Sequence, residues 1–282
     1  MKISAVLFLT DILPHRRRLF NKIVKNKIFN KHTSDEVFTT LKNNGIEGIE
    51  LMLPQFTRVT DEDLYDVKKM LDKYQIKVFS VHQQLRFFTK TRMTEITELF
   101  RIANIFGAKV IVLHVSNAGR QVFNKEYIAM VHALQKKHGI LVGYENMEKF
   151  FGSLHRGHTW HEDKFADLMK KNDFSITYDV QHLAHSGGDI VGFFKKNKNR
   201  IVNVHLSDYR KHILNTNLRP LRYKHLPLGK GELPITEFVQ TLKKEKYNGL
   251  VTMEIHTDLN GICESAQIVN AALDRRQHEE KK

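Results

Sequence analysis

The residues of this chain that could do chemistry stand where short apolar segments end. The segment FSITYD, residues 174–179, is typical of a buried strand that ends in Asp179, and His182 follows three residues later. A carboxylate and an imidazole at the end of an apolar strand suit a divalent metal better than a hydrophobic core. The same pattern recurs along the chain. The carboxylates and imidazoles at or just after such ends are Glu50, His82, His114, Glu145, Asp179, His182, His205, Asp208 and Glu254, with His225 in a later loop.

The elements that must position these side chains are strands and helices in strict alternation. The eight strands that we expect are residues 2–8, 45–53, 76–82, 108–114, 139–146, 174–179, 200–208 and 250–256. They are nearly continuous in apolar residues, as strands buried on both faces of a parallel sheet are. The alternation predicts a (β/α)₈ TIM barrel, a parallel eight-stranded barrel with outer helices. A doubly wound open sheet is the alternative, but no Gly-rich phosphate-binding turn follows the first strand.

Helix end signals support the same alternation. We expect Ser34 to cap the first long helix and Thr60 to start the next one, because both residue types favour the N-cap position. Further helices are expected at 94–106, 164–171, 189–198 and 262–273, among others. No linker or repeat interrupts the pattern. We therefore expect one TIM-barrel domain over residues 1–275 and a charged tail over 276–282.

Composition narrows the class of protein. No segment approaches the roughly 18 consecutive apolar residues that a membrane span needs, so we expect no membrane interaction. Cys263 is the only cysteine, which excludes a disulfide framework and makes the cytoplasm the default location. The formal net charge is +14, which would attract nucleic acid or phosphorylated substrates. Lysine-rich helix faces in solvent explain this charge equally well, and the role of the basic segment 14–31 and the oligomeric state stay open.

The strand ends of such a barrel meet at one rim, where TIM barrels place their active sites. A mixed shell of carboxylates and imidazoles without thiolates suits Zn²⁺ or Mn²⁺, with Co²⁺ and Fe²⁺ as alternatives. Four side chains from the fifth to the eighth strand are expected to surround one ion: Glu145, Asp179, His205 and Glu254. We expect His82 and His114 to lie too far from that ion, unless a second ion bridges through Glu145.

Five short motifs lie at or after the ends of the later strands: YEN at 144–146, YDVQH at 178–182, HLSD at 205–208, HLPLGKG at 225–231 and MEI at 253–255. With these motifs, and over nearly its whole length, the chain resembles the xylose isomerase-like TIM barrels, a superfamily shared by sugar phosphate isomerases and epimerases and by endonuclease IV. For the sugar branch, the resemblance implies that Glu145, Asp179, His205 and Glu254 bind the metal. It also implies that Glu145 and Glu254 transfer protons next to a carbonyl through an enediolate, and that His182 contacts the substrate. Arg86, Arg210 or Lys211 could bind a phosphate group of the sugar.

The endonuclease IV branch implies a different reaction, zinc-dependent hydrolysis of the phosphodiester at abasic sites by an apurinic/apyrimidinic endonuclease. Eight of the nine zinc-ligand positions match: His82, His114, Glu145, Asp179, His182, His205, His225 and Glu254. The ninth would be an aspartate where this chain has Tyr223, so the third zinc would lack a ligand. The sequence therefore favours a metal-dependent sugar or sugar-phosphate isomerase or epimerase with a small-molecule substrate. The endonuclease is the alternative, followed by other metal-dependent barrels such as dehydratases.

Overall fold

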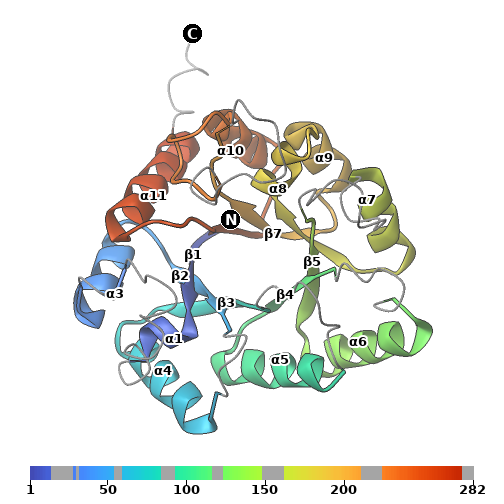
Figure 1. The fold of residues 1–282 in the computed structure, drawn as a ribbon, viewed down its shortest axis with the longest axis horizontal. Helices are drawn as coiled ribbons and strands as arrows, with labels where there is room; N and C mark the ends of the chain where they lie inside the picture. The colour runs from blue at the N-terminus through green and yellow to red at the C-terminus, as the bar shows by residue number, and fades with distance from the viewer. Residues whose placement is uncertain are drawn as a thin grey trace.

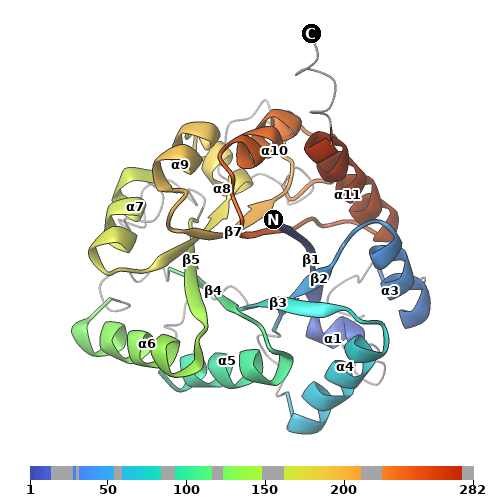
Figure 2. The same cartoon turned by 180° about the vertical axis from the view of Figure 1, so that it is seen from behind.

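The apolar segments of the sequence form eight parallel strands that close into a barrel in chain order (Figures 1 and 2). This computed structural model describes residues 1–13, 28–29, 32–53, 59–83, 93–115, 123–147, 162–210 and 224–274. The strands are β1 (Lys2–Phe8), β2 (Gly48–Met52), β3 (Lys77–His82), β4 (Val110–His114), β5 (Leu141–Glu145), β6 (Ser175–Asp179), β7 (Ile201–Leu206) and β8 (Leu250–Met253). The predicted TIM barrel is confirmed, with each strand within three residues of its expected start and end.

Helices surround the barrel and cover its outer apolar face (Figure 1). They are α1 (Leu9–Ile12), α3 (Ser34–Asn43), α4 (Asp61–Lys73), α5 (Met93–Phe106), α6 (Lys125–His138), α7 (Glu162–Lys171), α8 (Val180–His185), α9 (Ile190–Asn197), α10 (Ile235–Lys244) and α11 (Leu259–Asp274). The sequence patterns did not predict α1 or α8, which are only four and six residues long. None of the described helices is long and apolar enough to cross a membrane.

Two helix starts show how local sequence sets the ends of these elements. Thr60 caps α4 as predicted: its hydroxyl accepts a hydrogen bond from the Asp63 amide, 3.2 Å away, and the Asp63 carboxylate accepts one from the Thr60 amide at 2.8 Å. The cap of α3 is Thr33, so the expectation of Ser34 was wrong by one residue. Glu36 explains the difference, because its carboxylate reaches back to the Thr33 amide at 2.7 Å and completes a capping box.

The inside of the barrel has an apolar floor and a polar upper part. Phe79, Val110, Val112 and Leu250 pack together as a separate core cluster at the amino ends of the strands. The pairing of β2 with β3 shifts register there, passing over Phe79. Nearer the carboxyl ends the buried residues become polar, among them Ser4, Glu50, Ser80, Thr177, Asn203 and Thr252. TIM barrels usually fill this space with branched apolar side chains, so the polar interior points to a function.

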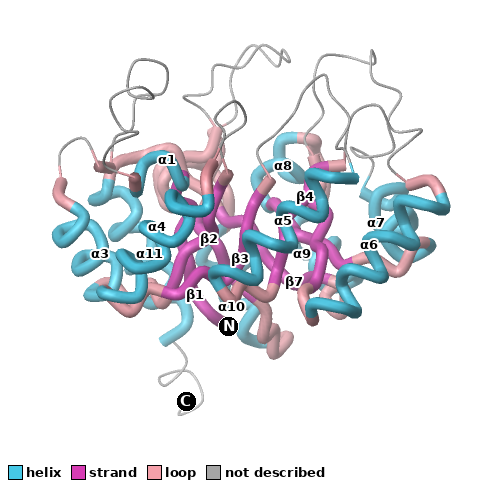
Figure 3. The backbone as a smooth tube through the Cα atoms, turned by 90° about the horizontal axis from the view of Figure 1, so that it is seen from below, coloured by secondary structure: helices cyan, strands magenta, loops and turns pink. Residues whose placement is uncertain are grey.

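Strand register places the candidate site residues side by side at the carboxyl rim. His114 of β4 pairs with Glu145 of β5, and Asp179 of β6 pairs with His205 of β7. Seen from the side, all strands run from the end where the amino terminus lies toward the end that carries α8 (Figure 3). The closed, parallel arrangement therefore delivers residues that are up to 172 positions apart in sequence, His82 to Glu254, to one end of the molecule.

The cap of α4 can be tested by substitution. We expect Thr60→Ala to lower the free energy of unfolding by about 1 kcal/mol, because the amide of Asp63 loses its hydrogen-bond acceptor. Urea-induced unfolding followed by circular dichroism measures this change. Thr39→Ala on the exposed face of α3 is the matched control, with an expected change within about 0.5 kcal/mol. Equal stability of the two variants would contradict the capping role of Thr60.

Candidate metal centre

Buried acidic and imidazole side chains gather at the carboxyl rim in three overlapping groups. Within each group the ligand atoms lie within 4.8 Å of one another. The groups are His82, Glu145, His205 and Glu254; then Glu145, Asp179 and His182; then Asp179, His225 and Glu254. Glu145, Asp179 and Glu254 each belong to two of these groups, so the three carboxylates connect the whole cluster.

Glu145, the last residue of β5, lies at the centre of the cluster and is only 1% exposed. Its Oε2 is 3.2 Å from His82 Nε2 and 3.0 Å from His114 Nε2. Its Oε1 is 3.3 Å from His182 Nδ1 and 3.6 Å from His205 Nδ1. Side chains from four other elements thus converge on one carboxylate.

The position of His82 corrects an expectation from the sequence. We expected His82 to lie too far from the ion held by the fifth to eighth strands, yet it shares a group with Glu145, His205 and Glu254. The reason is the narrow interior of an eight-stranded barrel, which side chains from opposite strands can span. His114 contacts the same Glu145 oxygen, although it belongs to none of the three groups.

Asp179 is fully buried at the end of β6, and its two carboxylate oxygens have different surroundings. Oδ1 caps α8 by accepting a hydrogen bond from the His182 amide at 2.6 Å. The spacing D-x-x-H is therefore that of an N-cap and the third residue of a short helix. Asn146 holds the backbone of Asp179 with two hydrogen bonds, of 2.7 and 2.8 Å. We predicted no role for Asn146 from the sequence, although it completes the YEN motif.

His205 lies between two carboxylates and is fully buried. Its Nδ1 is 2.8 Å from Glu254 Oε2, on the side of the cluster. Its Nε2 is 3.0 Å from Glu50 Oε1, on the side of the barrel floor. Glu254 follows β8 directly, and its amide donates to the carbonyl of Leu206 on β7. This hydrogen bond connects the carboxyl end of β7 to the carboxyl end of β8, and it keeps Glu254 next to His205.

Unsatisfied polar atoms show what this cluster can hold. Among the described residues, the buried atoms of this cluster without a hydrogen-bond partner are Glu50 Oε1, His114 Nδ1 and four more: Glu145 Oε1, Asp179 Oδ2, His205 Nδ1 and Glu254 Oε2. The last two of these four lie 2.8 Å apart as an ion pair. Buried polar atoms normally have hydrogen-bond partners, so four such atoms in one place need an explanation. They are three carboxylate oxygens and one imidazole nitrogen, a donor set that fits Zn²⁺ or Mn²⁺. They also belong to the four residues that the sequence predicted as ligands.

Shifted pKa values follow from the same burial. Burial favours the neutral acid, but the imidazoles of His114, His182 and His205 outweigh it and hold the pKa of Glu145 well below its usual range. His205 likewise lowers the pKa of Glu254 against the effect of burial. Burial raises the pKa of Asp179 to about 7. Clustered groups with such divergent pKa values are typical of functional sites.

His225 and Asp208 belong to the segment after β7. His225 adopts a left-handed backbone, with φ of 47°, and its Nδ1 lies 3.2 Å from the carbonyl oxygen of Glu254. Asp208 instead accepts hydrogen bonds from the amides of Tyr209, Gly229, Gly231 and Leu233, at 2.7–3.1 Å. A Cβ at Gly231 would collide with this carboxylate, so the glycine is required. This geometry favours Asp208 as an anchor for the HLPLGKG loop over a role as a metal or substrate ligand.

The residues expected to bind phosphate are only partly described. Arg86, Lys211 and Tyr223 lie outside the described residues, as do the 276–282 tail and most of the 14–31 segment. Arg210 is exposed, and its guanidinium donates to the carbonyl of Lys230 at 2.9 Å. The phosphate-binding role of all three basic residues therefore stays a prediction.

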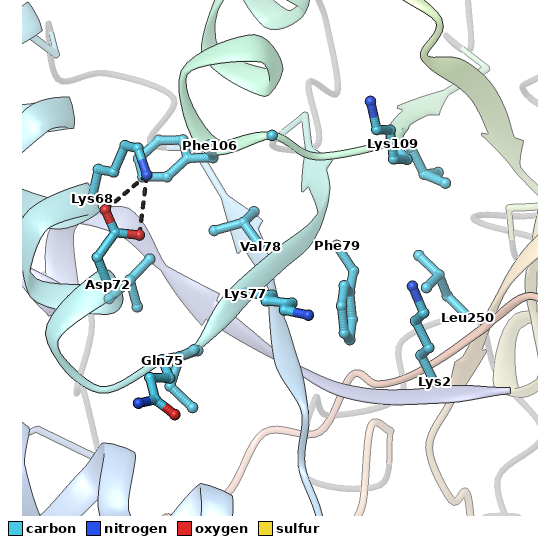
Figure 4. Close-up of a pocket in the computed structure, with 14 residues that line it drawn as sticks. Lys2, Lys68, Asp72, Gln75, Lys77, Val78, Phe79, Phe106, Lys109 and Leu250 are labelled. Atoms are coloured by element: carbon cyan, nitrogen blue, oxygen red, sulfur yellow. Dashed lines mark hydrogen bonds and ion pairs between the residues drawn. The ribbon is translucent and has the colours of Figure 1, made fainter.

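A hollow of about 480 Å³ lies at the other end of the barrel, beside the amino ends of β3 and β4 (Figure 4). Lys2, Lys77, Lys109 and Phe79 are among the residues that line it, and the Lys2 ammonium lies 5.1 Å from the centre of the Phe79 ring. Its lining contains none of the buried carboxylates or imidazoles of the rim. We therefore place the chemistry at the rim, where donor atoms converge, and not in this hollow.

Metal-binding measurements can distinguish Asp179, an expected metal ligand, from Asp208, which anchors a loop. We expect Asp179→Asn to weaken Zn²⁺ or Mn²⁺ binding by more than about a hundredfold, beyond the loss typical of an outer-shell partner, because a charged ligand is removed. Asp208→Asn is the matched control: it should lower the free energy of unfolding by roughly 1–3 kcal/mol and leave metal affinity unchanged. Isothermal titration calorimetry of both folded variants measures the affinities. Equal metal affinity of Asp179→Asn and the wild type would contradict the assignment.

Comparison with known proteins gives relatives and structures of the same architecture. An uncharacterized protein of Mycobacterium tuberculosis is 24% identical over 235 residues, 76% of this chain and 80% of the relative. An inosose dehydratase of Clostridium perfringens is 27% identical over 179 residues, 55% of this chain and 60% of that protein. A D-tagatose 3-epimerase-like protein superposes with a TM-score of 0.66 at 17% identity, covering 97% of both chains. The IOLI protein, solved with a zinc atom, superposes with a TM-score of 0.66 at 13% identity over 98% of this chain and 99% of that one.

The profile of one family spans most of the chain. It is described as xylose isomerase-like TIM barrel, and it matches residues 38–275, which run from α3 to the residue after α11 and include every residue of the rim cluster. The closed parallel barrel, the buried rim of carboxylates and imidazoles, and this match agree with one another. The chain belongs to the xylose isomerase-like TIM barrel family.

Proposed function

We propose that this protein is a metal-dependent sugar or sugar-phosphate isomerase or epimerase. The observation that carries the proposal is the set of four buried, unsatisfied donor atoms of Glu145, Asp179, His205 and Glu254 at the barrel rim. Relatives and fold neighbours named as epimerase and inosose dehydratase support sugar chemistry at such a rim. The substrate would be a small sugar that carries a carbonyl group.

The four donor residues would hold one divalent cation. A bound cation of this kind supplies Lewis-acid polarisation of a carbonyl, which makes the hydrogen on the neighbouring carbon more acidic. The zinc atom in the IOLI structure supports a metal in this fold. The protein's own contribution is a dry, rigid rim: three of the four residues are at most 1% exposed, and the Glu254 side chain is 12% exposed.

Glu145 and Glu254 would transfer the proton. Their lowered pKa values mean that both are carboxylates at neutral pH, the form that can remove a proton from carbon. His82 and His114 both face Glu145 Oε2, so they stabilise its charge while Oε1 stays without a hydrogen bond. In an epimerisation, one carboxylate would remove the proton from one side of the carbon and the other would return a proton from the opposite side.

His182 would orient the sugar. Its Nδ1 lies 3.0 Å from the carbonyl oxygen of Asn146, a group that can only accept a hydrogen bond. The proton of a neutral His182 therefore belongs on Nδ1, and Nε2 is then the acceptor nitrogen of the ring. The Glu254 side chain is 12% exposed, and the His225 ring lies 5.5 Å from the His182 ring, so we place the substrate over these residues.

Proton exchange tests this proposal directly. In D₂O, with Zn²⁺ or Mn²⁺, we expect the wild type to incorporate deuterium at the carbon next to the carbonyl of a ketose or ketose phosphate. Glu145→Gln and Glu254→Gln should each lower the exchange rate by at least about a hundredfold, the contribution of one positioned acid or base. Proton NMR over a panel of ketoses measures the exchange. Exchange that survives in both variants would remove their assigned roles.

A dehydration would begin with the same proton removal and then lose a neighbouring hydroxyl group. The inosose dehydratases among the relatives make this a related outcome of the same experiment. If an inosose or another cyclic ketone loses water while ketoses show no exchange, the proton-transfer site stands but the isomerase proposal fails.

An endonuclease of the endonuclease IV type is the second candidate function. The observation in its favour is the presence of three overlapping donor groups, which between them contain His82, His182 and His225 besides the four proposed ligands. We expect no incision of a DNA duplex with one abasic site by the metal-loaded protein, assayed by gel electrophoresis at several salt concentrations. Incision that Glu145→Gln abolishes would establish the nuclease and overturn the sugar proposal.

A further inference from the structure

Glu50 is a buried carboxylate that the proposed chemistry leaves without a role. It lies on β2, opposite Ser80 of β3 in the sheet register, and it is fully buried. It belongs to none of the three groups that could hold a metal. A buried, ionised carboxylate is costly unless hydrogen-bond donors surround it, so its surroundings should show why it is there.

Three donors from two strands, β3 and β7, meet at Glu50. The Ser80 hydroxyl donates to Oε2 at 2.6 Å, and the Asn203 amide donates to the same oxygen at 2.9 Å. His205 Nε2 lies 3.0 Å from Oε1 and 3.3 Å from Oε2. All three hydrogen bonds are accepted by Oε2, while Oε1 has the His205 ring nitrogen as an ion-pair neighbour and no hydrogen-bond partner. An ionised carboxylate can only accept, so the ring nitrogen that bonds to it carries a proton.

The orientation of the Asn203 amide is set by a chain of hydrogen bonds that crosses the barrel interior. Thr252 Oγ1 donates to Asn203 Oδ1 at 2.8 Å, and Ser4 Oγ lies 2.9 Å from Thr252 Oγ1. Because the amide oxygen receives the threonine hydroxyl, the amide NH₂ group must face Glu50. All of these residues are fully buried. The polar interior of the barrel thus holds the Glu50 carboxylate in one place.

This arrangement acts on the other nitrogen of His205. Nδ1 faces Glu254 Oε2 at 2.8 Å and Glu145 Oε1 at 3.6 Å, and it makes no hydrogen bond. An imidazole that binds a metal is neutral and carries one proton, so a proton held on Nε2 leaves the lone pair of Nδ1 for the metal. Carboxylates that accept from the outer nitrogen of a histidine ligand fix its tautomer and ring orientation.

We propose that Glu50 is a positioning residue that orients His205, with its Nδ1 lone pair directed into the metal site. Glu50 acts through His205 and not on the substrate, since it is buried beneath the ring. The proposal rests on the proposed metal site at the rim. It also explains why a carboxylate occupies a layer of the barrel that could be filled with apolar side chains.

Metal affinity of a substituted protein tests the proposal. We expect Glu50→Gln to weaken Zn²⁺ and Mn²⁺ binding about ten- to a hundredfold, because a glutamine can donate to Nε2 and favour the tautomer with its proton on Nδ1. Ser4→Ala is the matched control. It removes a buried hydroxyl from the far end of the same hydrogen-bond chain without touching Glu50, and its metal affinity should stay within about twofold of the wild type. Calorimetric titration of the metal-free, full-length proteins measures both.

The possible results separate this proposal from the function proposed above. If the wild type binds metal and Glu50→Gln binds it equally well, the role of Glu50 is refuted and the metal site stands. If the wild type binds neither Zn²⁺ nor Mn²⁺, the proposed metal site itself fails. If Glu50→Gln weakens binding but Ser4→Ala weakens it as much, the effect is one of general packing, and the positioning role is refuted.

A measurement on the wild type keeps the proposal testable if Glu50→Gln does not fold. In zinc-loaded protein with ¹⁵N-labelled histidine, NMR should show a His205 proton on Nε2 that exchanges slowly with solvent, and no proton on Nδ1. A His205 proton on Nδ1, or rapid exchange at Nε2, would overturn the proposal.

Discussion

Repulsion between buried carboxylates is the constraint on which this structure depends. Charges of one sign at close range repel strongly in a protein interior, and the cost falls only if opposite charge is placed among them. The protein supplies imidazoles for this purpose, and each carboxylate of the cluster has at least one imidazole nitrogen within 3.6 Å. The compensation is incomplete, because four donor atoms at the rim stay unsatisfied. A divalent cation would complete it, which is why we regard the cluster as a binding site and not as a structural core.

The barrel makes this arrangement possible because its two ends differ: apolar packing closes one end, and the polar cluster lies at the other. Phe79 and its apolar neighbours close the amino end, so the packing energy there does not depend on the polar cluster. At the carboxyl end, several groups serve structure and site at once. Asp179 caps α8 with one oxygen and leaves the other for the cluster, and Asn146 joins β5 to Asp179 of β6. The site is therefore rigid because its residues are also the ends of strands and helices.

Sequence patterns predicted the barrel and the rim residues because both depend on local periodicity and on strand ends. Distances across the barrel were not predictable in this way: closure brings His82 to Glu145, and no sequence spacing encodes that contact. The short helix α8 was missed because six residues carry too little periodicity, although Asp179 has the form of its cap. The backbone contacts of Asp208 were not predictable for a similar reason. Its acidic side chain resembles a ligand in the sequence, but backbone amides from a loop more than twenty residues later surround it.

The central claim is that one divalent cation binds among Glu145, Asp179, His205 and Glu254. Crystals soaked in Mn²⁺, measured at the manganese absorption edge, test it most directly through anomalous difference density. We predict one peak at the carboxyl rim, bonded to all four side chains, and no peak beside His114 or His225. Three peaks at the rim would contradict the single-ion site and favour the endonuclease. The absence of any peak within bonding distance of these four residues would contradict the account as a whole.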